Sequence, residues 1–183
     1  MIRLRTPLSH DDVMRLKTGD SVLLSGTLLT ARDRAHVFLL SGDFPPARQA
    51  VIYHCGPVVK DGEVIAAGPT TSSRMNPYTP DLIKAYETRA IIGKGGMSED
   101  VLAALRHRAV YLSAVGGAAV IYAKSMKVTK VFKEEFGMPE ALWQLEVEDF
   151  PATVTMDAHG NSLHEKVRQE SAKVHRELIS PKL

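Results

Sequence analysis

The chain has 183 residues, of which 44% are hydrophobic and 24% charged, which is enough for one domain with an ordinary core. A formal net charge of +2 and an aromatic content of 6% argue against a nucleic-acid-binding protein. The aliphatic runs are too short to cross a bilayer, and residues 1–7 lack the apolar core of a signal peptide, so we expect a cytoplasmic protein that makes no membrane contact.

The single cysteine, Cys55, allows neither a disulfide within the chain nor a metal cluster held by its cysteines alone. The seven histidines have no spacing typical of metal ligands, so the sequence predicts no metal site in this chain. Cys55 lies in an apolar run without an identifiable partner base, which favours a small strand residue over a nucleophile.

The first half of the chain begins with an extended arm over residues 1–20, which leads into a short helix that Ser9 could cap. Gly26 indicates a bulge or a close backbone approach in the strand that follows. The remaining elements predicted in this half are strand 21–29, a segment 30–36 that turns into the helical run 37–40, loop 41–49, strand 50–55, turn 60–62, return strand 63–67 and helix 81–86.

Arg32 falls where the first strand gives way to a helix, a place where side chains and free backbone N–H groups can face a ligand. The alternative is a charged first helical turn in which Arg32 and Asp33 are only solvated. The local sequence favours neither interpretation.

A second candidate is the loop 68–75, which carries the hydroxyl groups of residues 70–73 together with Arg74. It follows the strand 64–67 and precedes a helix for which Thr79 is the expected N-cap and Pro80 the first helical residue. Hydroxyl groups and a planar guanidinium can surround an oxyanion such as a carboxylate. The alternative is a turn with no ligand, which is the commoner use of such a loop.

A third candidate is Lys94, in the glycine-rich loop 93–100 between a short buried strand, 90–92, and a helix capped by Ser98. The loop lacks the remaining positions of a nucleotide P-loop, so ATP is not predicted here. The alternative is a plain glycine turn with an exposed lysine.

The second half predicts strands, a small-residue helix and a C-terminal helix over residues 162–183 with Leu163, Val167, Val174 and Leu178 on one stripe. Asp157 and His159 could form a catalytic pair, but the density of Asp, Gly and Asn favours a turn at 157–161. The other elements are strand 109–113, helix 118–123, strand 128–132, strand 142–148 and strand 153–156. The whole, residues 1–183, is predicted to be a single α/β domain with a mixed sheet.

Arg32, the Thr70 and Arg74 loop, and Lys94 each follow a predicted strand and precede a predicted helix. If the strands are neighbours, the three loops meet at one edge of the sheet, where ligands commonly bind in open α/β folds. Three cations with hydroxyl groups and glycine N–H groups suit a small dianion. A dicarboxylate fits better than a nucleotide, because no base or ribose pocket can be identified.

Five motifs follow one another along the chain: Thr-Ala-Arg-Asp-x-Ala-His at 30–36, His-Cys-Gly-Pro at 54–57, Ala-Gly-Pro-Thr-Thr-Ser-x-Arg-Met at 67–75, Gly-Lys-Gly-Gly-Met at 93–97 and Asp-x-His-Gly-Asn at 157–161. In this order and at these intervals, they resemble the β subunit or C-terminal domain of class I fumarases and L(+)-tartrate dehydratases. The resemblance extends from about Thr6 to Glu165.

The resemblance implies a swivelling β/β/α domain with a mixed central sheet flanked by helices. It also implies a hydro-lyase that adds or removes water across a small dicarboxylate. A 4Fe-4S cluster would be held by three cysteines of a separate α subunit, in a hetero-oligomer such as α2β2, and by no residue of this chain.

By motif position, the resemblance implies that Thr70 and Lys94 are catalytic, with Thr70 the base that takes the carbon-bound proton of malate. Arg32, Thr70, Thr71, Arg74 and Lys94 would bind substrate. The resemblance gives no clear role to Asp33, His36 and Gly95, which would support the site.

Two alternatives to a fumarase stay open on the sequence. One is an L(+)-tartrate dehydratase β subunit, with the same subunit plan and one more hydroxyl on the substrate. The other is a non-catalytic dicarboxylate-binding module, although all matched site positions keep their functional side chains.

Overall fold

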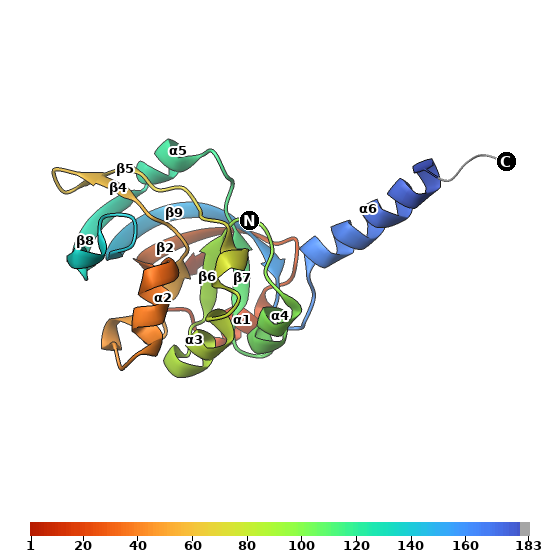
Figure 1. Ribbon diagram of the computed structural model, residues 1–183, viewed down its shortest axis with the longest axis horizontal. Helices are drawn as coiled ribbons and strands as arrows, with labels where there is room; N and C mark the ends of the chain where they lie inside the picture. The colour runs from red at the N-terminus through yellow and green to blue at the C-terminus, as the bar shows by residue number, and fades with distance from the viewer. Residues whose placement is uncertain (180–183) are drawn as a thin grey trace.

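The computed structural model describes residues 1–179 and has a mixed sheet flanked by helices (Figure 1). The strands are, in chain order, β1 (Ile2–Arg5), β2 (Ser21–Thr30), β3 (Val51–Tyr53), β4 (Val58–Lys60), β5 (Glu63–Ala66), β6 (Ala90–Gly93), β7 (Val110–Ser113), β8 (Met126–Phe132) and β9 (Leu142–Met156). The predicted α/β class with a mixed central sheet is confirmed.

The central sheet has the order β1-β2-β3-β6-β7-β9-β8, and β9 also pairs with β2. The neighbours β1, β2, β3, β6 and β7 are parallel, whereas β9 is antiparallel to β2, β7 and β8. Because β9 pairs with both β2 and β7, the strands β2, β3, β6, β7 and β9 close into a barrel-like ring. The hairpin β4–β5 forms a separate small sheet.

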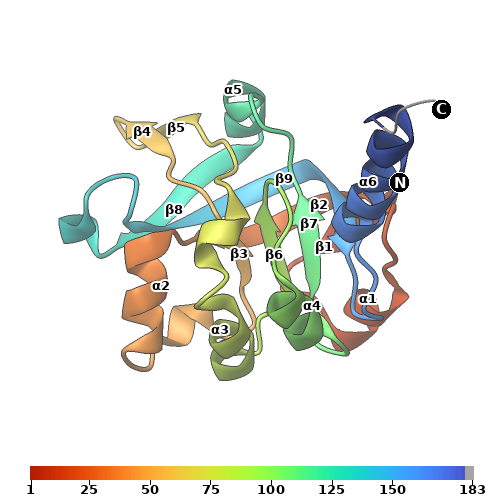
Figure 2. The same cartoon turned by 45° about the vertical axis from the view of Figure 1, so that its right-hand side comes forward.

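The helices are α1 (His10–Arg15), α2 (Asp33–Leu40), α3 (Thr79–Tyr86), α4 (Glu99–Leu105), α5 (Ala119–Ala123) and α6 (Leu163–Ile179). Figure 2 shows α2, α3 and α4 side by side along the outer face of β3, β6 and β7. This placement follows from the crossover connections between parallel strands, which nearly always have one hand.

Apolar strand residues fill the inside of the ring and the layer beneath the helices. One buried cluster includes Leu24, Tyr53, Leu112 and Phe150 from strands around the ring. Two further clusters lie under α2 and α3 and under α3 and α4. The four residues of β6 are all buried, which explains why this segment is apolar without alternation.

Several predicted local features are confirmed at the level of single hydrogen bonds. Ser9 caps α1 in a reciprocal capping box with Asp12, and the Ser98 hydroxyl accepts from the Val101 backbone N–H at the start of α4. The register of β2 with β9 shifts at Gly26, where an added Cβ would lie 2.4 Å from Thr6 Oγ1. The glycine therefore permits both the bulge and the close approach of the N-terminal arm.

Three boundaries were predicted wrongly. The strands expected at 142–148 and 153–156 are one strand, β9, which continues through a register shift where Asp149 adopts a φ of 50°. The N-cap of α3 is Tyr78, and Thr79 lies inside the helix, where its hydroxyl donates to the Met75 carbonyl at 2.8 Å. The arm over residues 1–20 is more than an extension, because β1 joins the central sheet beside β2.

The C-terminal helix α6 projects away from the sheet and the other helices (Figure 1). Its predicted stripe exists, but Val167, Val174 and Leu178 are exposed in this chain. The last residues of the predicted helix, 180–183, lie outside the described part. Among residues 1–179, the structure contains no helix that is long and apolar enough to span a membrane.

Candidate functional site

The carboxyl ends of β2, β3 and β6 bring two of the three candidate loops to one edge of the sheet. These strands are parallel neighbours, so Arg32 after β2 and Lys94 after β6 flank the segment that follows β3. Arg32 is the N-cap residue of α2, and its carbonyl accepts the first hydrogen bond of that helix from the His36 N–H at 2.9 Å. The predicted convergence of these two loops at one edge therefore holds.

The Thr70 loop reaches the same edge by a route that the sequence did not predict. The strand before it, β5, belongs to the hairpin and not to the central sheet. The loop is instead inserted between the ends of β3 and β6 by backbone hydrogen bonds. Thr70 N donates to His54 O at 2.6 Å, Lys94 N donates to Thr70 O at 3.1 Å, and Ser72 N donates to Lys94 O at 3.1 Å.

Two of the three expected cations are paired with carboxylates. An Nη atom of Arg74 lies 2.5 Å from an oxygen of Asp33, which gives Asp33 a defined contact. Arg32 Nε lies 3.4 Å from a carboxylate oxygen of Glu140 and, although buried, has no hydrogen bond within residues 1–179. In the same range Lys94 forms no ion pair and is exposed, so the site has an excess of positive charge.

A buried polar cluster of His36, His54, Ser72 and Tyr111 lies behind these loops, and all four residues are fully buried. His36 Nδ1 lies 2.8 Å from the Arg32 carbonyl oxygen, and His54 Nδ1 lies 2.8 Å from Ser72 Oγ. The Tyr111 hydroxyl donates to Ser72 Oγ at 2.9 Å. The cluster thus connects the backbone of the Arg32 loop, the end of β3 and the Thr70 loop with β7.

Both histidines of the cluster are neutral near pH 7. Burial lowers the pKa of His36 to about 4 and the pKa of His54 well below its usual range, and on His54 the charge of Arg74, and that of His36 when it is protonated, act in the same direction. Because a carbonyl oxygen only accepts, neutral His36 carries its proton on Nδ1. The ring centroids are 5.1 Å apart, and neither Nε2 atom has a hydrogen-bond partner within the described residues.

His36, which was predicted to support the site without a defined function, is fully buried. A fully buried ring behind the backbone of Arg32 cannot touch a ligand at the loop surface. Its contact with the Arg32 carbonyl instead fixes the start of α2. The exposed residues Thr71 and Gly95 lie in the loops themselves, where Thr71 forms a parallel bridge with Lys94 and Gly95 has a φ of +71° that favours glycine.

Two glycines allow the close approaches on which this arrangement depends. A Cβ on Gly93 would lie 1.9 Å from Ser72 Oγ and 3.1 Å from the Tyr111 hydroxyl. A Cβ on Gly56 would lie 2.7 Å from both Arg32 Nη1 and the Pro139 carbonyl oxygen. A side chain at either position would push a site loop outward.

Sequence reasoning missed Glu140 and three of the four cluster residues. Glu140 lies on a connector more than 100 positions after Arg32, with which its carboxylate forms an ion pair. The same carboxylate accepts a hydrogen bond from the backbone N–H of Arg34 at 3.0 Å. His54 and Ser72 stood inside motifs that carried the resemblance, which was the one available signal. Nothing in the sequence singles out Tyr111 from other strand tyrosines.

Residues 1–179 contain no group of three or more His, Cys, Asp or Glu side chains that could hold a metal ion. Cys55 is buried, and burial raises the pKa of its thiol to about 12, which keeps it protonated. The expectation of a small strand residue at Cys55 agrees with this environment.

Asp157 and His159 form a turn, as the sequence favoured, and not a catalytic pair. The Asp157 carboxylate accepts hydrogen bonds from the backbone N–H groups of Thr18, His159 and Asn161. These bonds lower the pKa of Asp157 against the opposing effect of burial.

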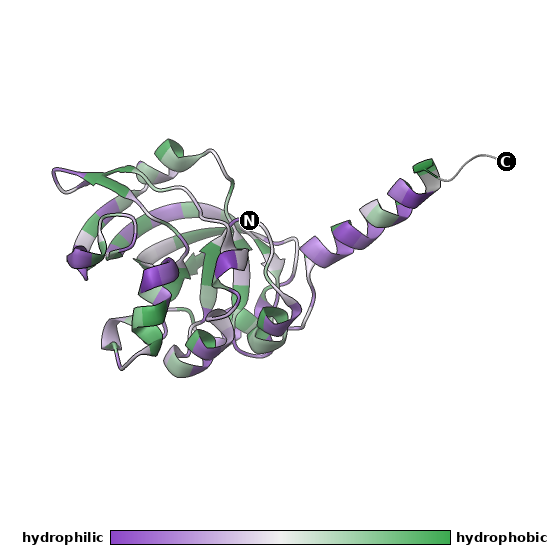
Figure 3. Ribbon diagram, viewed as in Figure 1, coloured by the Kyte–Doolittle hydropathy of each residue, from purple (hydrophilic) through white to green (hydrophobic). Residues whose placement is uncertain are grey.

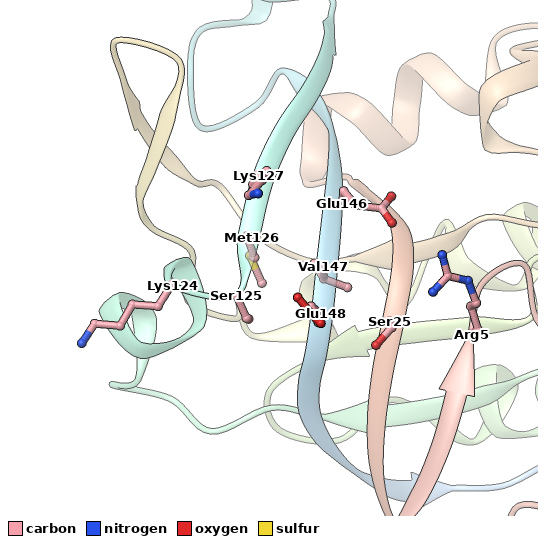
Figure 4. A pocket seen from close by; sticks show the side chains of 9 residues that line it. All are labelled: Arg5, Ser25, Lys124, Ser125, Met126, Lys127, Glu146, Val147 and Glu148. Atoms are coloured by element: carbon pink, nitrogen blue, oxygen red, sulfur yellow. The ribbon is translucent and has the colours of Figure 1, made fainter.

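A separate hollow of about 340 Å³ opens beside β2, β8 and β9 (Figure 4). Arg5, Lys124, Lys127, Glu146 and Glu148 contribute its charges, and it includes none of the candidate site residues. Three cations and two carboxylates line it, which is the same balance of charge as at the loop edge, so net charge does not separate the two regions.

The loop edge can bind a small anion with two charged groups. Lys94 supplies an unpaired cation, the two arginines supply N–H groups beyond those used by Asp33 and Glu140, and the Thr70 and Thr71 hydroxyls lie on the same inserted loop. Rigid packing behind these groups holds them in place before a ligand arrives.

Comparison with known proteins gives a consistent result over most of the chain. Residues 1–167 match the family described as Fumarase C-terminus. The chain is 48% identical to a Geobacillus stearothermophilus protein named "Putative fumarate hydratase class I", over 93% of this chain but 35% of that protein.

Two other relatives have a length close to that of this chain. A Methanocaldococcus jannaschii protein named "Putative L(+)-tartrate dehydratase subunit beta" is 44% identical over 94% of this chain and 95% of that protein. The "L(+)-tartrate dehydratase subunit beta" of Escherichia coli K12 is 35% identical over 87% of this chain and 85% of that protein.

Proposed function

Because the chain belongs to the family of the fumarase C-terminus, we propose that it is the β subunit of a hydro-lyase that interconverts (S)-malate and fumarate plus water. It would act with a separate α subunit. The relative named for fumarate hydratase, which is 48% identical over 93% of this chain, supports this substrate.

The observation that carries the proposal is the insertion of the Thr70 loop between the ends of β3 and β6. It places the backbone of Thr70 directly beside that of Lys94, with Lys94 N donating to Thr70 O at 3.1 Å. A hydroxyl and an unpaired ammonium on adjacent segments, with Arg74 on the inserted loop and Arg32 on the flanking loop, suit a substrate with two carboxylates and an acidic carbon-bound proton.

In this proposal Arg32, Arg74 and Lys94 bind the substrate carboxylates, with Thr71 as a further donor. Asp33 holds the Arg74 guanidinium at 2.5 Å and so orients its remaining N–H groups toward the substrate. Gly95 gives the Lys94 loop its backbone path. These roles predict that Arg74→Lys is not neutral, because a lysine cannot form two parallel hydrogen bonds.

Thr70 would remove the proton from carbon as the general base. An alcohol has a pKa far above neutrality, so this role requires stabilisation of its alkoxide. The cationic charge of Lys94 and Arg74 acts in that direction, since opposite charges favour the ionised form. The proton passes from carbon to the Thr70 alkoxide oxygen, the C–H electron pair forms the double bond, and the hydroxyl group leaves the adjacent carbon with its bonding electrons, so that proton and hydroxide together make the water released.

In this proposal the 4Fe-4S cluster that the family implies takes none of its ligands from this chain, whose Cys55 is buried and protonated. We therefore assign to this chain only substrate binding and the carbon–proton step. Three cysteines of the α subunit would hold the cluster.

L(+)-tartrate dehydratase is the second candidate, and a specific observation favours it. The relatives named as tartrate dehydratase β subunits match along 95% and 85% of their own lengths, so they share the subunit size of this chain. Comparing turnover of (S)-malate and L(+)-tartrate by the same preparation separates the two candidates.

The test is an anaerobic purification of the tagged chain from its native host, followed by assays on both substrates. We expect a copurifying cysteine-bearing subunit, iron–sulfur absorbance and hydration of fumarate. A colourless, inactive chain that stays alone after iron and sulfide are supplied would contradict the proposal. Tight calorimetric binding of malate by that lone chain would then favour a non-catalytic binding module.

Thr70→Ala tests the base within the same complex. We expect normal assembly and a fall in kcat of about a thousandfold, within the range for loss of a positioned acid–base group. Ser73→Ala is the matched control, because Ser73 is an exposed hydroxyl of the same loop to which we assign no role. Full activity of Thr70→Ala would exclude Thr70 as the base.

A further inference from the structure

Exposed apolar side chains gather around one side of the candidate site. We define the apolar rim as Val58 and Ile65 of the hairpin, Val115, Val120 and Ile121 of the α5 region, and Met138 of the β8–β9 connector, all of which are exposed. Figure 3 shows α5 and the adjoining hairpin largely in the hydrophobic colour. Scattered exposed hydrophobic residues need no explanation, but a contiguous group suggests a binding surface.

Local packing contacts make the rim continuous. Ala67 N, at the end of β5, donates to the Ala119 carbonyl of α5 at 3.0 Å, and a Cβ on Gly68 would lie 3.0 Å from Ala119 Cβ. On the other side of the hairpin, Val59 N donates to the sulfur of Met138 at 3.4 Å. The hairpin therefore joins α5 to the β8–β9 connector.

Both ends of the rim meet the candidate site. A Cβ on Gly116, next to Val115, would lie 3.4 Å from Lys94 Cδ, so the lysine side chain passes against this segment. At the other end, Pro139 and Glu140 follow Met138 directly, and Glu140 pairs with Arg32 at 3.4 Å. Figure 2 shows the hairpin and α5 on the side of the sheet toward which β6 and β7 point.

We propose that the apolar rim is the surface on which the cluster-bearing α subunit docks. This inference rests on the proposed function. An elimination at the loop edge needs a second set of groups facing Thr70 and Lys94, and a partner seated on the rim would supply them directly over the mouth. The same contact would exclude water from an exposed cationic site and so strengthen its hold on a dianion.

The stripe on α6 is the alternative docking surface, and its position argues against it. Val174 and Leu178 lie on the helix that projects away from the sheet, whereas the site loops lie at the ends of β2, β3 and β6 (Figure 1). The family match also ends at residue 167, within α6, although the match includes the whole rim. A partner bound only to the distal part of α6 would leave the mouth open.

The experiment compares two matched double variants of the full chain in the α–β complex. Val120→Asp with Ile121→Asp places two charges on the rim, where the side chains are 62% and 68% exposed. Val174→Asp with Leu178→Asp does the same on α6, where they are 53% and 79% exposed. The probe is the α subunit recovered with the wild-type chain and identified by its three cluster cysteines.

We expect the rim variant to bind the α subunit about thirtyfold more weakly, which is the effect of losing one interface hot spot, and to regain turnover at high α concentration. The α6 variant should bind as the wild type does. Both full-length variants should melt at the wild-type temperature, because the changed side chains are exposed.

Wild-type affinity of the rim variant, or loss of binding by the α6 variant alone, would overturn the inference. A rim variant that loses self-association but keeps the α subunit would overturn it as well. These outcomes presuppose a wild-type complex that turns over malate or tartrate. A wild-type complex without turnover on either substrate contradicts the proposed function instead.

Discussion

The loop edge at the ends of β2, β3 and β6 and the hollow of Figure 4 are both rich in charge, but they are built differently. At the loop edge, cations on separate loops share a buried backing formed by the polar cluster. In the hollow, charged side chains stand on β1, β8 and β9 and at the end of α5, where Figure 4 shows Lys124 pointing away from the other charges.

The difference between these two regions shows that a concave volume does not by itself identify a binding site. The hollow measures about 340 Å³. Its glutamates, Glu146 and Glu148, are simply the outward-facing polar residues of β9, which alternate along the strand with the buried Leu145 and Val147. The loop edge is held by buried hydrogen bonds and by glycines without room for a side chain. Preorganised groups of this kind are what binding and catalysis require.

The largest expected effect comes from Lys94→Met, which removes the unpaired cation of the loop edge and keeps the length of its apolar stem. We expect kcat/KM for malate in the complex to fall about a thousandfold, as for loss of one preorganised charged donor. Lys127→Met is the matched control from the hollow, and it should be neutral. If kcat/KM of the Lys94→Met variant fell less than tenfold, the proposed functional difference between the loop edge and the hollow would be wrong.

The backing of the loop edge can be broken by adding one carbon atom. Gly93→Ala places a Cβ where Ser72 Oγ now lies, and we expect the free energy of unfolding to fall by about 3 kcal/mol from overpacking. In a Ser72→Ala background the same change should cost less, because the contact at 1.9 Å is gone and the nearest remaining Ser72 atom would lie 3.3 Å away. Urea unfolding of the wild type, the two single variants and the double variant measures this double-mutant cycle. An equal cost of Gly93→Ala in both backgrounds would contradict the predicted clash with Ser72.

The sequence predicted the loop edge better than its backing, for physical reasons. Arg32 and Lys94 follow strands whose apolar character is local, so their placement at one edge needed only the order of parallel strands. The insertion of the Thr70 loop depends on backbone hydrogen bonds to His54 and Lys94, which no local pattern encodes. The catalytic and binding roles of Arg32, Thr70 and Lys94 stay predictions.

Long-range pairings account for the features that were missed. Glu140 reaches Arg32 across more than 100 positions, and Tyr111 reaches Ser72 across 39. The two predicted strands of β9 are one because Ser25 supports the bulge at Asp149, whose backbone N–H donates to Ser25 Oγ at 3.0 Å. The resemblance supplied the family, which composition and periodicity could not.

The buried histidines predict a smaller effect, on stability below neutral pH. His36 is neutral in the folded chain and has a pKa of about 4, whereas an unfolded histidine titrates near 6.5. Between these values the unfolded chain binds more protons, so stability is complete above pH 6.5 and is lost as the pH falls. His36 alone should cost about 2 kcal/mol between pH 7 and pH 5.

His36→Gln isolates this contribution, because glutamine does not titrate. Urea unfolding at pH 7 and pH 5 should give a smaller loss for the variant, by about the same 2 kcal/mol. His54 keeps a depressed pKa in the variant, so part of the acid sensitivity should remain. An identical loss in both chains would show that His36 takes up a proton without disturbing the cluster.

The smallest expected effect belongs to the hollow. Glu146→Gln with Lys124→Met should change the free energy of unfolding by less than about 0.5 kcal/mol and leave kcat/KM within about twofold. The Glu146 carboxylate accepts one exposed hydrogen bond, from Thr27 Oγ1 at 3.1 Å, and a glutamine oxygen can still accept it. A tenfold loss of turnover in this variant, measured beside Lys94→Met, would mean that the second region takes part in the reaction and that the contrast between them is wrong.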